Sequence, residues 1–289
     1  MAIRKILLPL AGVASARSAL ATGLMIAKRR NAHLYALHVR TDTRDVAPLA
    51  GEGLSGAMIE DMMKATEREG QSEAQALEAL FKAMAEEAGV TVGQPGPASA
   101  SVATAQFESI MGREEDITAD EARLADLIVV PHPKSADDVA SADALHAVLF
   151  DSGRPALIAP TAEPASIGAR IAIGWNGTAE SASAVGSALP WMREAEAVRI
   201  FFSPEYQRQG PSAARLVEFL ALHGVTADTA QFATVDRSVG AGLLSAASDF
   251  GADLLAMGAY SHSRLRQLIL GGVTRHVLAN AHLPVLMNR

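Results

Sequence analysis

The sequence predicts an α/β protein of two tandem doubly wound domains, each an open, mostly parallel five-stranded sheet with helices on both faces. Three observations lead to this prediction. Short apolar runs alternate with longer helical segments along the chain, which is typical of βαβ units on a parallel sheet. The runs are apolar at successive positions, as expected for strands that helices cover on both sides. The same order of elements occurs twice.

Each half opens with an apolar strand, a small-residue turn and an Ala-rich helical segment. The opening strands are expected over 3–8 and 170–175. Right-handed crossovers between successive units then give an open sheet. In the second half we expect further strands over 197–202, 226–232, 252–257 and 284–287, and helices over 178–192, 211–223, 240–250 and 271–280.

An internal repeat relates the two halves. The string Ala-Asp-Leu-Ile-Val-Val at 125–130 matches Ala-Asp-Leu-Leu-Ala-Met at 252–257. Residues 148–158 also line up with residues 277–287. We interpret this repeat as a tandem duplication with its junction near 160–168.

The repeat predicts domains at 1–162 and 163–289, and the first carries an insertion over 44–66 without a counterpart in the second. We interpret the insertion as a short helix docked on its own domain or on its twin; a lid or partner-docking helix that uses soft Met contacts is the alternative. A loop is expected over 93–101. Four apolar residues of the insertion follow one another at helical spacing: Met58, Ile59, Met62 and Met63.

Composition and charge exclude several classes of protein. The 289 residues contain no cysteine, which removes disulfides, thiolate metal sites and a cysteine nucleophile. A formal net charge of −7, with the acidic excess in the first half, argues against binding to nucleic acid or anionic membranes. The apolar runs are shorter than the roughly 20 residues of a membrane helix, and the start lacks a signal peptide. We therefore expect a cytoplasmic protein.

The candidate ligand site lies beyond the carboxyl ends of the first and fourth strands of the second half, where open parallel sheets bind ligands. These segments are 174–178 and 257–274. The later one reads Gly258-Ala-Tyr-Ser261, nine residues, then Gly271-Gly272-Val273-Thr274. The first glycine lets the chain leave the strand tightly. The glycine pair opens a helix whose free N–H groups and dipole attract phosphate.

This pattern resembles the universal stress protein family, whose nucleotide-binding signature is Gly-x-x-Gly, nine residues, Gly-Ser/Thr after the fourth strand. The resemblance covers the chain as two copies. It implies a cytoplasmic, non-catalytic stress-response regulator that binds adenine nucleotide, as ATP with Mg²⁺, through its second domain. It also implies pairing through the last strand of each domain, a homodimer and an unidentified protein partner. The residues expected to line ribose and phosphates are Gly258, Gly271, Gly272, Val273 and Thr274.

The sequence departs from this signature at three positions. Ser261 replaces the second glycine, and Gly272 replaces the hydroxyl residue, although Thr274 could supply an oxygen. Asn176 stands where many nucleotide-binding members have an aspartate. Two alternatives therefore stay open: a nucleotide-independent dimeric interaction scaffold, and a slow ATP hydrolase that would rely on backbone N–H groups and arginines.

The first half departs further from the signature. After its fourth strand the chain reads Pro131-His132-Pro133-Lys134, and the glycine pair becomes Ala142-Asp143. Prolines remove backbone donors, and Asp143 places a negative charge where phosphate would bind. We therefore predict no nucleotide in the first half and assign it a role in packing against the second.

Other polar residues are interpreted structurally. Asp126 and Asp253 each begin a fourth strand, at the amino edge of the sheet, so a capping role is expected. Trp175 is expected to pack in the core. The sequence shows neither a metal-binding spacing nor a catalytic triad, so no catalytic residue is assigned. Three cations between the motif halves could reach triphosphate or remain solvated: His262, Arg264 and Arg266.

Overall fold

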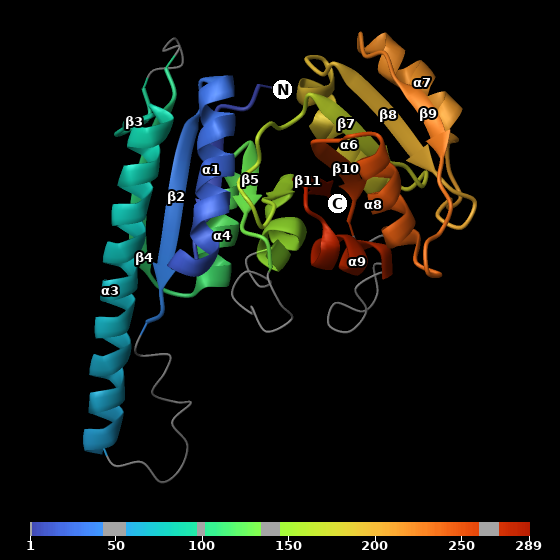
Figure 1. The fold of residues 1–289 in the computed structure, drawn as a ribbon. Coiled ribbons are helices and arrows are strands. Elements are labelled where there is room, and N and C mark those ends of the chain that lie inside the picture. The colour runs from blue at the N-terminus through green and yellow to red at the C-terminus, as the bar shows by residue number, and fades with distance from the viewer. Residues whose placement is uncertain (1, 43–55, 97–101, 134–144, 260–271) are drawn as a thin grey trace.

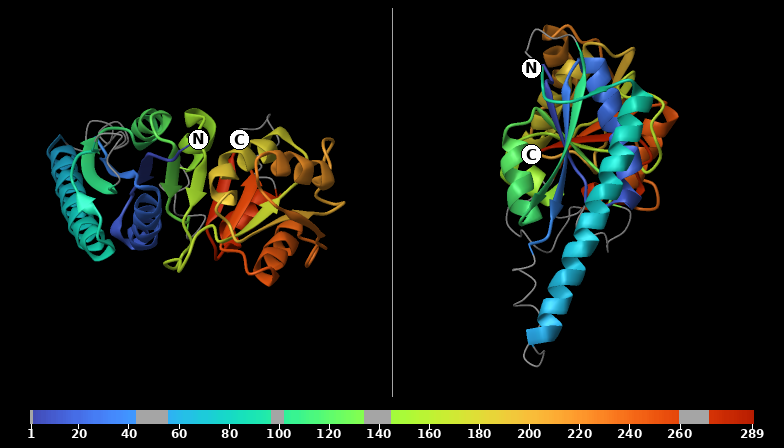
Figure 2. Two further views of the ribbon diagram at one scale, coloured as in Figure 1. Left: turned by 90° about the horizontal axis from the view of Figure 1, so that it is seen from above. Right: turned by 90° about the vertical axis from the view of Figure 1, so that its left-hand side faces the viewer.

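The computed structural model describes residues 2–42, 56–96, 102–133, 145–259 and 272–289 (Figure 1). Within these ranges the strands form one 11-stranded sheet in the order β3-β4-β2-β1-β5-β6-β11-β10-β7-β8-β9. Figure 2 shows helices on both faces of this sheet. The predicted α/β class with two doubly wound units is therefore confirmed.

The second half follows the sequence prediction closely, with small differences at the ends of elements. Its five strands pair with one another only in parallel. The strands are β7 (Arg170–Gly174), β8 (Ala197–Phe202), β9 (Asp228–Gln231), β10 (Leu254–Gly258) and β11 (Val285–Asn288). The helices are α6 (Ala179–Met192), α7 (Ala213–Leu222), α8 (Val239–Asp249) and α9 (Gly272–Asn280).

The first half repeats this strand order and adds a two-residue edge strand, β3 (Thr91–Val92), which the sequence analysis did not predict. Residues 93–96 form a loop, as expected. The remaining strands are β1 (Lys5–Pro9), β2 (His33–Arg40), β4 (Thr104–Met111), β5 (Leu127–Val130) and β6 (Ala156–Ile158). The helical elements are α1 (Val13–Arg30), α3 (Gly56–Ala88), α4 (Glu114–Arg123) and a π-helical turn at Val148–Ser152.

The two halves join through their last strands. β6 pairs with β5 in parallel and with β11 antiparallel, where Leu157 lies opposite Leu286. The pairing between last strands that the family resemblance implied thus occurs within one chain. Among the described strands, the outer edges of the joined sheet are β3 and β9. A second chain would therefore have to use another surface.

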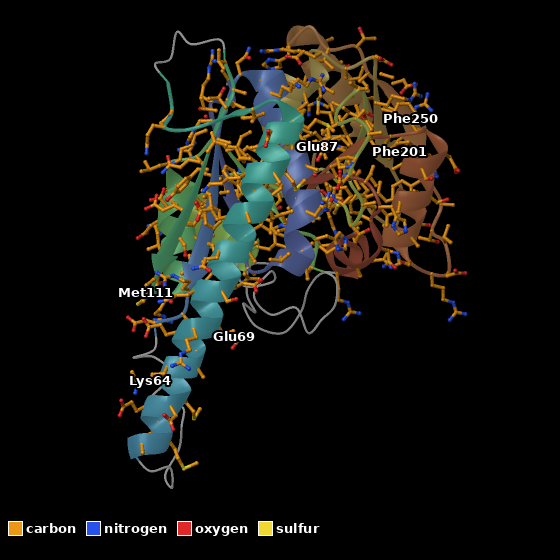
Figure 3. All side chains as sticks on the ribbon, turned by 60° about the vertical axis from the view of Figure 1, so that its left-hand side comes forward. Lys64, Glu69, Glu87, Met111, Phe201 and Phe250 are labelled. Atoms are coloured by element: carbon orange, nitrogen blue, oxygen red, sulfur yellow. The ribbon has the colours of Figure 1, made fainter. Side chains whose placement is uncertain are left out.

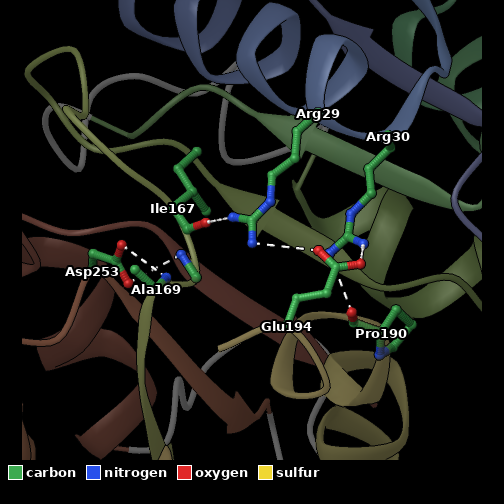
Figure 4. Close-up of polar contacts among 8 residues, drawn as sticks. Arg29, Arg30, Ile167, Ala169, Pro190, Glu194 and Asp253 are labelled. Carbon is green, nitrogen blue, oxygen red and sulfur yellow. Dashed lines mark hydrogen bonds and ion pairs between the residues drawn. The ribbon is translucent and has the colours of Figure 1, made fainter. Parts of the chain in front are cut away.

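A cluster of arginines on α1 also links the halves (Figure 4). The Arg30 guanidinium pairs with Glu194, donates to the Pro190 carbonyl at 3.2 Å and lies 4.9 Å from the ring centre of Trp191. Arg29 reaches the same Glu194 at 3.4 Å. Because Arg30 comes from the first half and its partners lie in α6 or just after it, these contacts connect the two halves.

Residues 56–66 of the insertion form the start of a long helix, not a short one, and residues 44–55 lie outside the described residues. The structure continues a single helix, α3, from Gly56 to Ala88, because the apolar stripe and good helix formers run on past residue 66. Its later turns bury Leu77 and Phe81 against the domain. Its early turns project beyond the sheet (Figures 1 and 3), and Met62 there is 43% exposed. The prediction of a short docked helix was wrong for these early turns.

The core consists of two apolar layers, one on each face of the sheet. One layer joins the strands to α1, α3, α6 and α7, and the other joins them to α4, α8 and α9. Alternate residues of β1 show the division, because Leu8 lies in the first layer and Leu7 in the second. Across the described part of the chain, no helix is long and apolar enough to cross a membrane.

Candidate functional site

The carboxyl ends of β7 and β10 meet at one edge of the second half. Met257 lies beside Gly174 in the parallel ladder, so Gly258 follows at the same edge as the β7–α6 loop. A Cβ atom on Gly258 would lie 2.5 Å from the Ser181 backbone nitrogen. A glycine is therefore required there, because the first turn of α6 packs directly against the end of β10.

Asn176 shapes the β7–α6 loop. Its side chain is 8% exposed, and Oδ1 accepts hydrogen bonds from the Thr178 backbone N–H at 3.2 Å and the Thr178 hydroxyl at 3.0 Å. Thr178 in turn caps α6 by accepting a bond from the Ser181 N–H. The side-chain oxygen of Asn176 thus stabilises the start of the helix.

The β8–α7 loop over 203–212 forms a wall beside this edge, which the sequence analysis missed. The Arg208 N–H donates to the Asn176 carbonyl at 2.8 Å, and the Trp175 indole donates to the Pro211 carbonyl at 2.9 Å. Gly177 has a φ of +82°, and a Cβ on Gly210 would lie 2.0 Å from the Gly177 carbonyl oxygen. Two glycines are thus needed where the loops cross, and the Gly-Pro pair after the second strand was the available signal.

Buried polar groups hold this loop in place. Ser203 is fully buried and donates to the Glu205 carboxylate, which lowers the pKa of Glu205. Tyr206 packs 6.1 Å from the ring of Phe232, and burial raises the pKa of its phenol. The expectation that Trp175 packs in the core is confirmed, since it is 4% exposed within the first apolar layer.

The start of α9 supplies the other predicted site residues. The helix begins at Gly272, where an added Cβ would meet no atom within 4 Å. Val273 is half-buried and Thr274 is 6% exposed. The first N–H groups of such a helix lack partners within the helix. The predicted residues Ser261 and Gly271, together with His262, Arg264 and Arg266, lie outside the described residues.

The two aspartates at the amino edge act as caps, as predicted. Asp253 accepts bonds from the backbone N–H groups of Gly168, Ala169 and Arg170 at 2.8 to 3.0 Å, and Figure 4 shows Asp253 beside Ala169. Asp126 accepts equivalent bonds from the N–H groups of Arg4 and Lys5 at 2.8 and 3.0 Å. Both carboxylates thus stabilise the start of a first strand, away from the candidate site.

The corresponding edge of the first half is built differently. Gly12 precedes α1 and offers no capping side chain, and the Glu73 carboxylate from α3 accepts a bond from the Val13 N–H instead. A cavity of about 330 Å³ lies beside the first turns of α1. Its lining includes Ser15, Ser18, His132, Pro160 and Glu163. Within the described part of the chain, no group of three His, Asp or Glu side chains could hold a metal ion.

Comparison with known proteins gives a family match within the second half and a fold for the whole chain. The model of the universal stress protein family matches residues 177–289. A universal stress protein from Archaeoglobus fulgidus DSM 4304 superposes with a TM-score of 0.67 at 16% identity, covering 99% of this chain and 96% of that one. A putative universal stress protein from Pseudomonas aeruginosa UCBPP-PA14 gives a TM-score of 0.53 at 15% identity, with 99% and 93% covered. No curated protein matches the chain.

Proposed function

The second half of this chain belongs to the universal stress protein family, the whole chain has the fold of tandem proteins of this kind, and on this premise we propose that it is a non-catalytic, cytoplasmic stress-response regulator that binds adenine nucleotide. The nucleotide is assigned to the second half, beyond β7 and β10. The first half serves as its structural partner.

One observation carries this proposal: the topology gathers the required backbone elements at one edge. Gly258 lets α6 approach β10 closely, and α9 begins at the exposed Gly272. Parallel sheets bind ligands at such an edge, where the strand order reverses between β7 and β10. A helix start with unsatisfied N–H groups is suited to phosphate.

The roles of the individual residues follow from this arrangement. The backbone N–H groups of Gly272, Val273 and Thr274 would bind phosphate oxygens, with Ser261 and Gly271 in the same motif. Mg²⁺ would enter with a triphosphate, because it prefers phosphate oxygens and water as ligands. Asn176 would position the loop beside the ribose through its bonds to Thr178.

A pair of substitutions at Gly272 tests the assignment. A side chain fits there without a clash, so Gly272→Asp adds a charge and Gly272→Asn serves as its neutral isostere. The aspartate also reproduces the first half, where Asp143 aligns with Gly272. We expect ATP affinity, measured by calorimetry, to fall about tenfold or more for the Asp variant relative to the Asn variant. Equal affinities would overturn the site.

A nucleotide-independent scaffold is the second candidate function, and the projecting start of α3 favours it. Met62 is 43% exposed on a face continuous with the buried stripe of the same helix. We propose that this surface carries the predicted homodimer contact, because β6 and β11 already pair within the chain. Met62→Glu should then convert a dimer to a monomer in sedimentation, with Ala65→Glu as control. A wild-type monomer would rule this contact out.

A further inference from the structure

A half-open cavity of about 470 Å³ lies in the first half, at the amino edge of the sheet. It is at the opposite edge from the proposed nucleotide site and belongs to the other half of the chain. The cavity lies over β1, β2 and β4 on the face that α4 partly covers. Its polar lining includes Lys5, His33, Tyr35, Thr104, Glu108 and Glu121.

Hydrogen bonds hold these side chains in a fixed arrangement. Tyr35 is 7% exposed and donates from its hydroxyl to Glu108 at 2.8 Å. Lys5 pairs with Glu121 at 3.2 Å and lies 5.1 Å from the centre of the Tyr35 ring. His33 is 9% exposed and bonds through Nδ1 to the Thr104 hydroxyl at 2.9 Å. The cavity therefore presents one buried aromatic ring, the carboxylates of Glu108 and Glu121, and the cations of Arg4 and Lys5, of which Lys5 pairs with Glu121.

The second half provides an internal comparison. Asp126 and Asp253 donate from their N–H groups to the carbonyls of Lys5 and Arg170, each at 2.9 Å, so Arg170 corresponds to Lys5. Strand register places Leu7 beside Tyr35 and Ala172 beside Arg199. Leu7 lies two residues after Lys5, and Ala172 lies two residues after Arg170. Arg199 of the second half therefore occupies the position of Tyr35 in the first.

Side chains fill the equivalent space in the second half. The ring of Phe250 packs against two guanidinium groups, with its centre 4.5 Å from that of Arg170 and 4.7 Å from that of Arg199. Arg199 also pairs with Asp228 through two bonds of 2.8 and 2.5 Å. Figure 3 shows Phe250 beside Phe201 in this layer. A guanidinium, an aromatic ring and a carboxylate thus pack together within the chain.

The first half has no aromatic side chain at the position of Phe250. Arg123 stands three residues before Asp126, as Phe250 stands three before Asp253. The Arg123 guanidinium donates a hydrogen bond to the Asp151 carbonyl at 3.2 Å and forms an ion pair with Asp120 on its own helix. Among the described residues Glu108 makes no ion pair, and an ionised carboxylate that accepts one bond from Tyr35 can accept several more. Arg4 also lines the cavity, but its guanidinium donates to the Asn31 carbonyl at 3.5 Å, and no described residue pairs a guanidinium with Glu108.

We propose that this cavity binds a small molecule that carries a guanidinium group. The ligand's guanidinium would bond to Glu108 and lie against Tyr35, as Arg199 bonds to Asp228 and lies against Phe250. Burial and then the charge of Lys5 lower the pKa of His33, so this imidazole adds no positive charge near neutral pH. Binding in this cavity would be independent of nucleotide binding in the second half.

Calorimetric titration with agmatine tests the proposal, and arginine serves as a second probe that adds a carboxylate to the same guanidinium. We expect saturable binding of agmatine to the full chain. Glu108→Gln should weaken it about tenfold or more, because it removes a charge-assisted bond. Glu60→Gln, on the projecting part of α3, should leave it unchanged. If arginine binds more tightly than agmatine, Arg4 or Lys5 also bonds to the carboxylate of the ligand.

A second variant fills the cavity without changing the charge of the lining. Arg123→Phe places a phenyl ring where Phe250 stands in the second half, and it should abolish agmatine binding. No binding to the wild-type chain up to about 10 mM agmatine would overturn the proposal. Wild-type affinity in both Glu108→Gln and Arg123→Phe would overturn it equally. Neither result would affect the nucleotide assignment, which concerns the other half.

Discussion

The carboxylate of Glu73 accepts a hydrogen bond of 2.8 Å from the backbone N–H of Val13, which lies 60 residues earlier in the chain. Gly12 precedes α1 and has no side chain that could fill this role. A negative charge at a helix N-terminus also interacts favourably with the helix dipole. The long helix α3 is thereby attached to the start of α1.

Removing this contact should destabilise the first half. We expect Glu73→Ala to lower the free energy of unfolding by about 1 kcal/mol, as for the loss of an N-terminal cap, and Glu73→Gln to cost less. Urea unfolding followed by circular dichroism measures this. Glu69→Ala, one turn earlier on α3 and exposed, is the matched control. Equal stability of both alanine variants would show that the bond contributes nothing.

The arginine contacts between the halves should contribute more to the free energy of unfolding than an exposed ion pair at the same junction does. Arg30, with 11% of its side chain exposed, bonds to Glu194 and Pro190. We expect Arg30→Met to lower the free energy of unfolding by about 1 to 3 kcal/mol. Arg17→Met removes an exposed pair with Glu163 and should change it by less than about 0.5 kcal/mol. The reverse order would contradict the assigned role of Arg30.

Alanine substitution should destabilise the protein at one glycine of the candidate site and leave its stability unchanged at another. At Gly258 a methyl group would lie 2.5 Å from the Ser181 nitrogen, so Gly258→Ala should destabilise by about 1 to 3 kcal/mol. At Gly272 the methyl group meets no atom within 4 Å, and Gly272→Ala should be neutral within about 0.5 kcal/mol. Thermal unfolding of both variants decides this, and a neutral Gly258→Ala would refute the close approach.

His33 should make stability fall with acid. Burial, and then Lys5, hold its pKa below the ordinary value of 6.5. Between those two pKa values the unfolded chain binds more protons than the folded one, so stability decreases as pH falls through about 6.5.

Urea unfolding of the wild type and His33→Gln, measured at about pH 7.5 and pH 5, tests this expectation. The wild type should lose more stability on acidification than His33→Gln. His282→Gln, at an exposed histidine, should behave like the wild type. Equal losses of stability in all three proteins would show that His33 does not cause the pH dependence.

The sequence predicts most of the fold because its strands are short apolar runs and its halves repeat. The repeat also predicted the paired roles of Asp126 and Asp253, because each stands at the start of the fourth strand of its half. The start of α3 was misjudged because alignment with the second half places it in an insertion, whereas helix formation depends on its own continuous stripe.

The surroundings of the candidate site were less predictable. The packing of Gly210 on Gly177 and the contact of Arg30 with Glu194 join residues far apart in sequence. No periodic pattern in the sequence indicates either contact. The cavity at the amino edge of the first half also depends on the direction of the Arg123 side chain, which the sequence does not show. Such features depend on tertiary packing, whereas the glycine signature of the second half is local.

The most direct test of nucleotide binding by the second half is the thermal-unfolding midpoint of purified protein with and without about 1 mM Mg-ATP, together with mass spectrometry of retained small molecules. At a ligand concentration about 100 times Kd, binding adds roughly 2.7 kcal/mol, a rise in Tm of several degrees. We predict that rise in the wild type and its loss in Gly272→Asp. An unchanged Tm with no retained nucleotide would contradict the account.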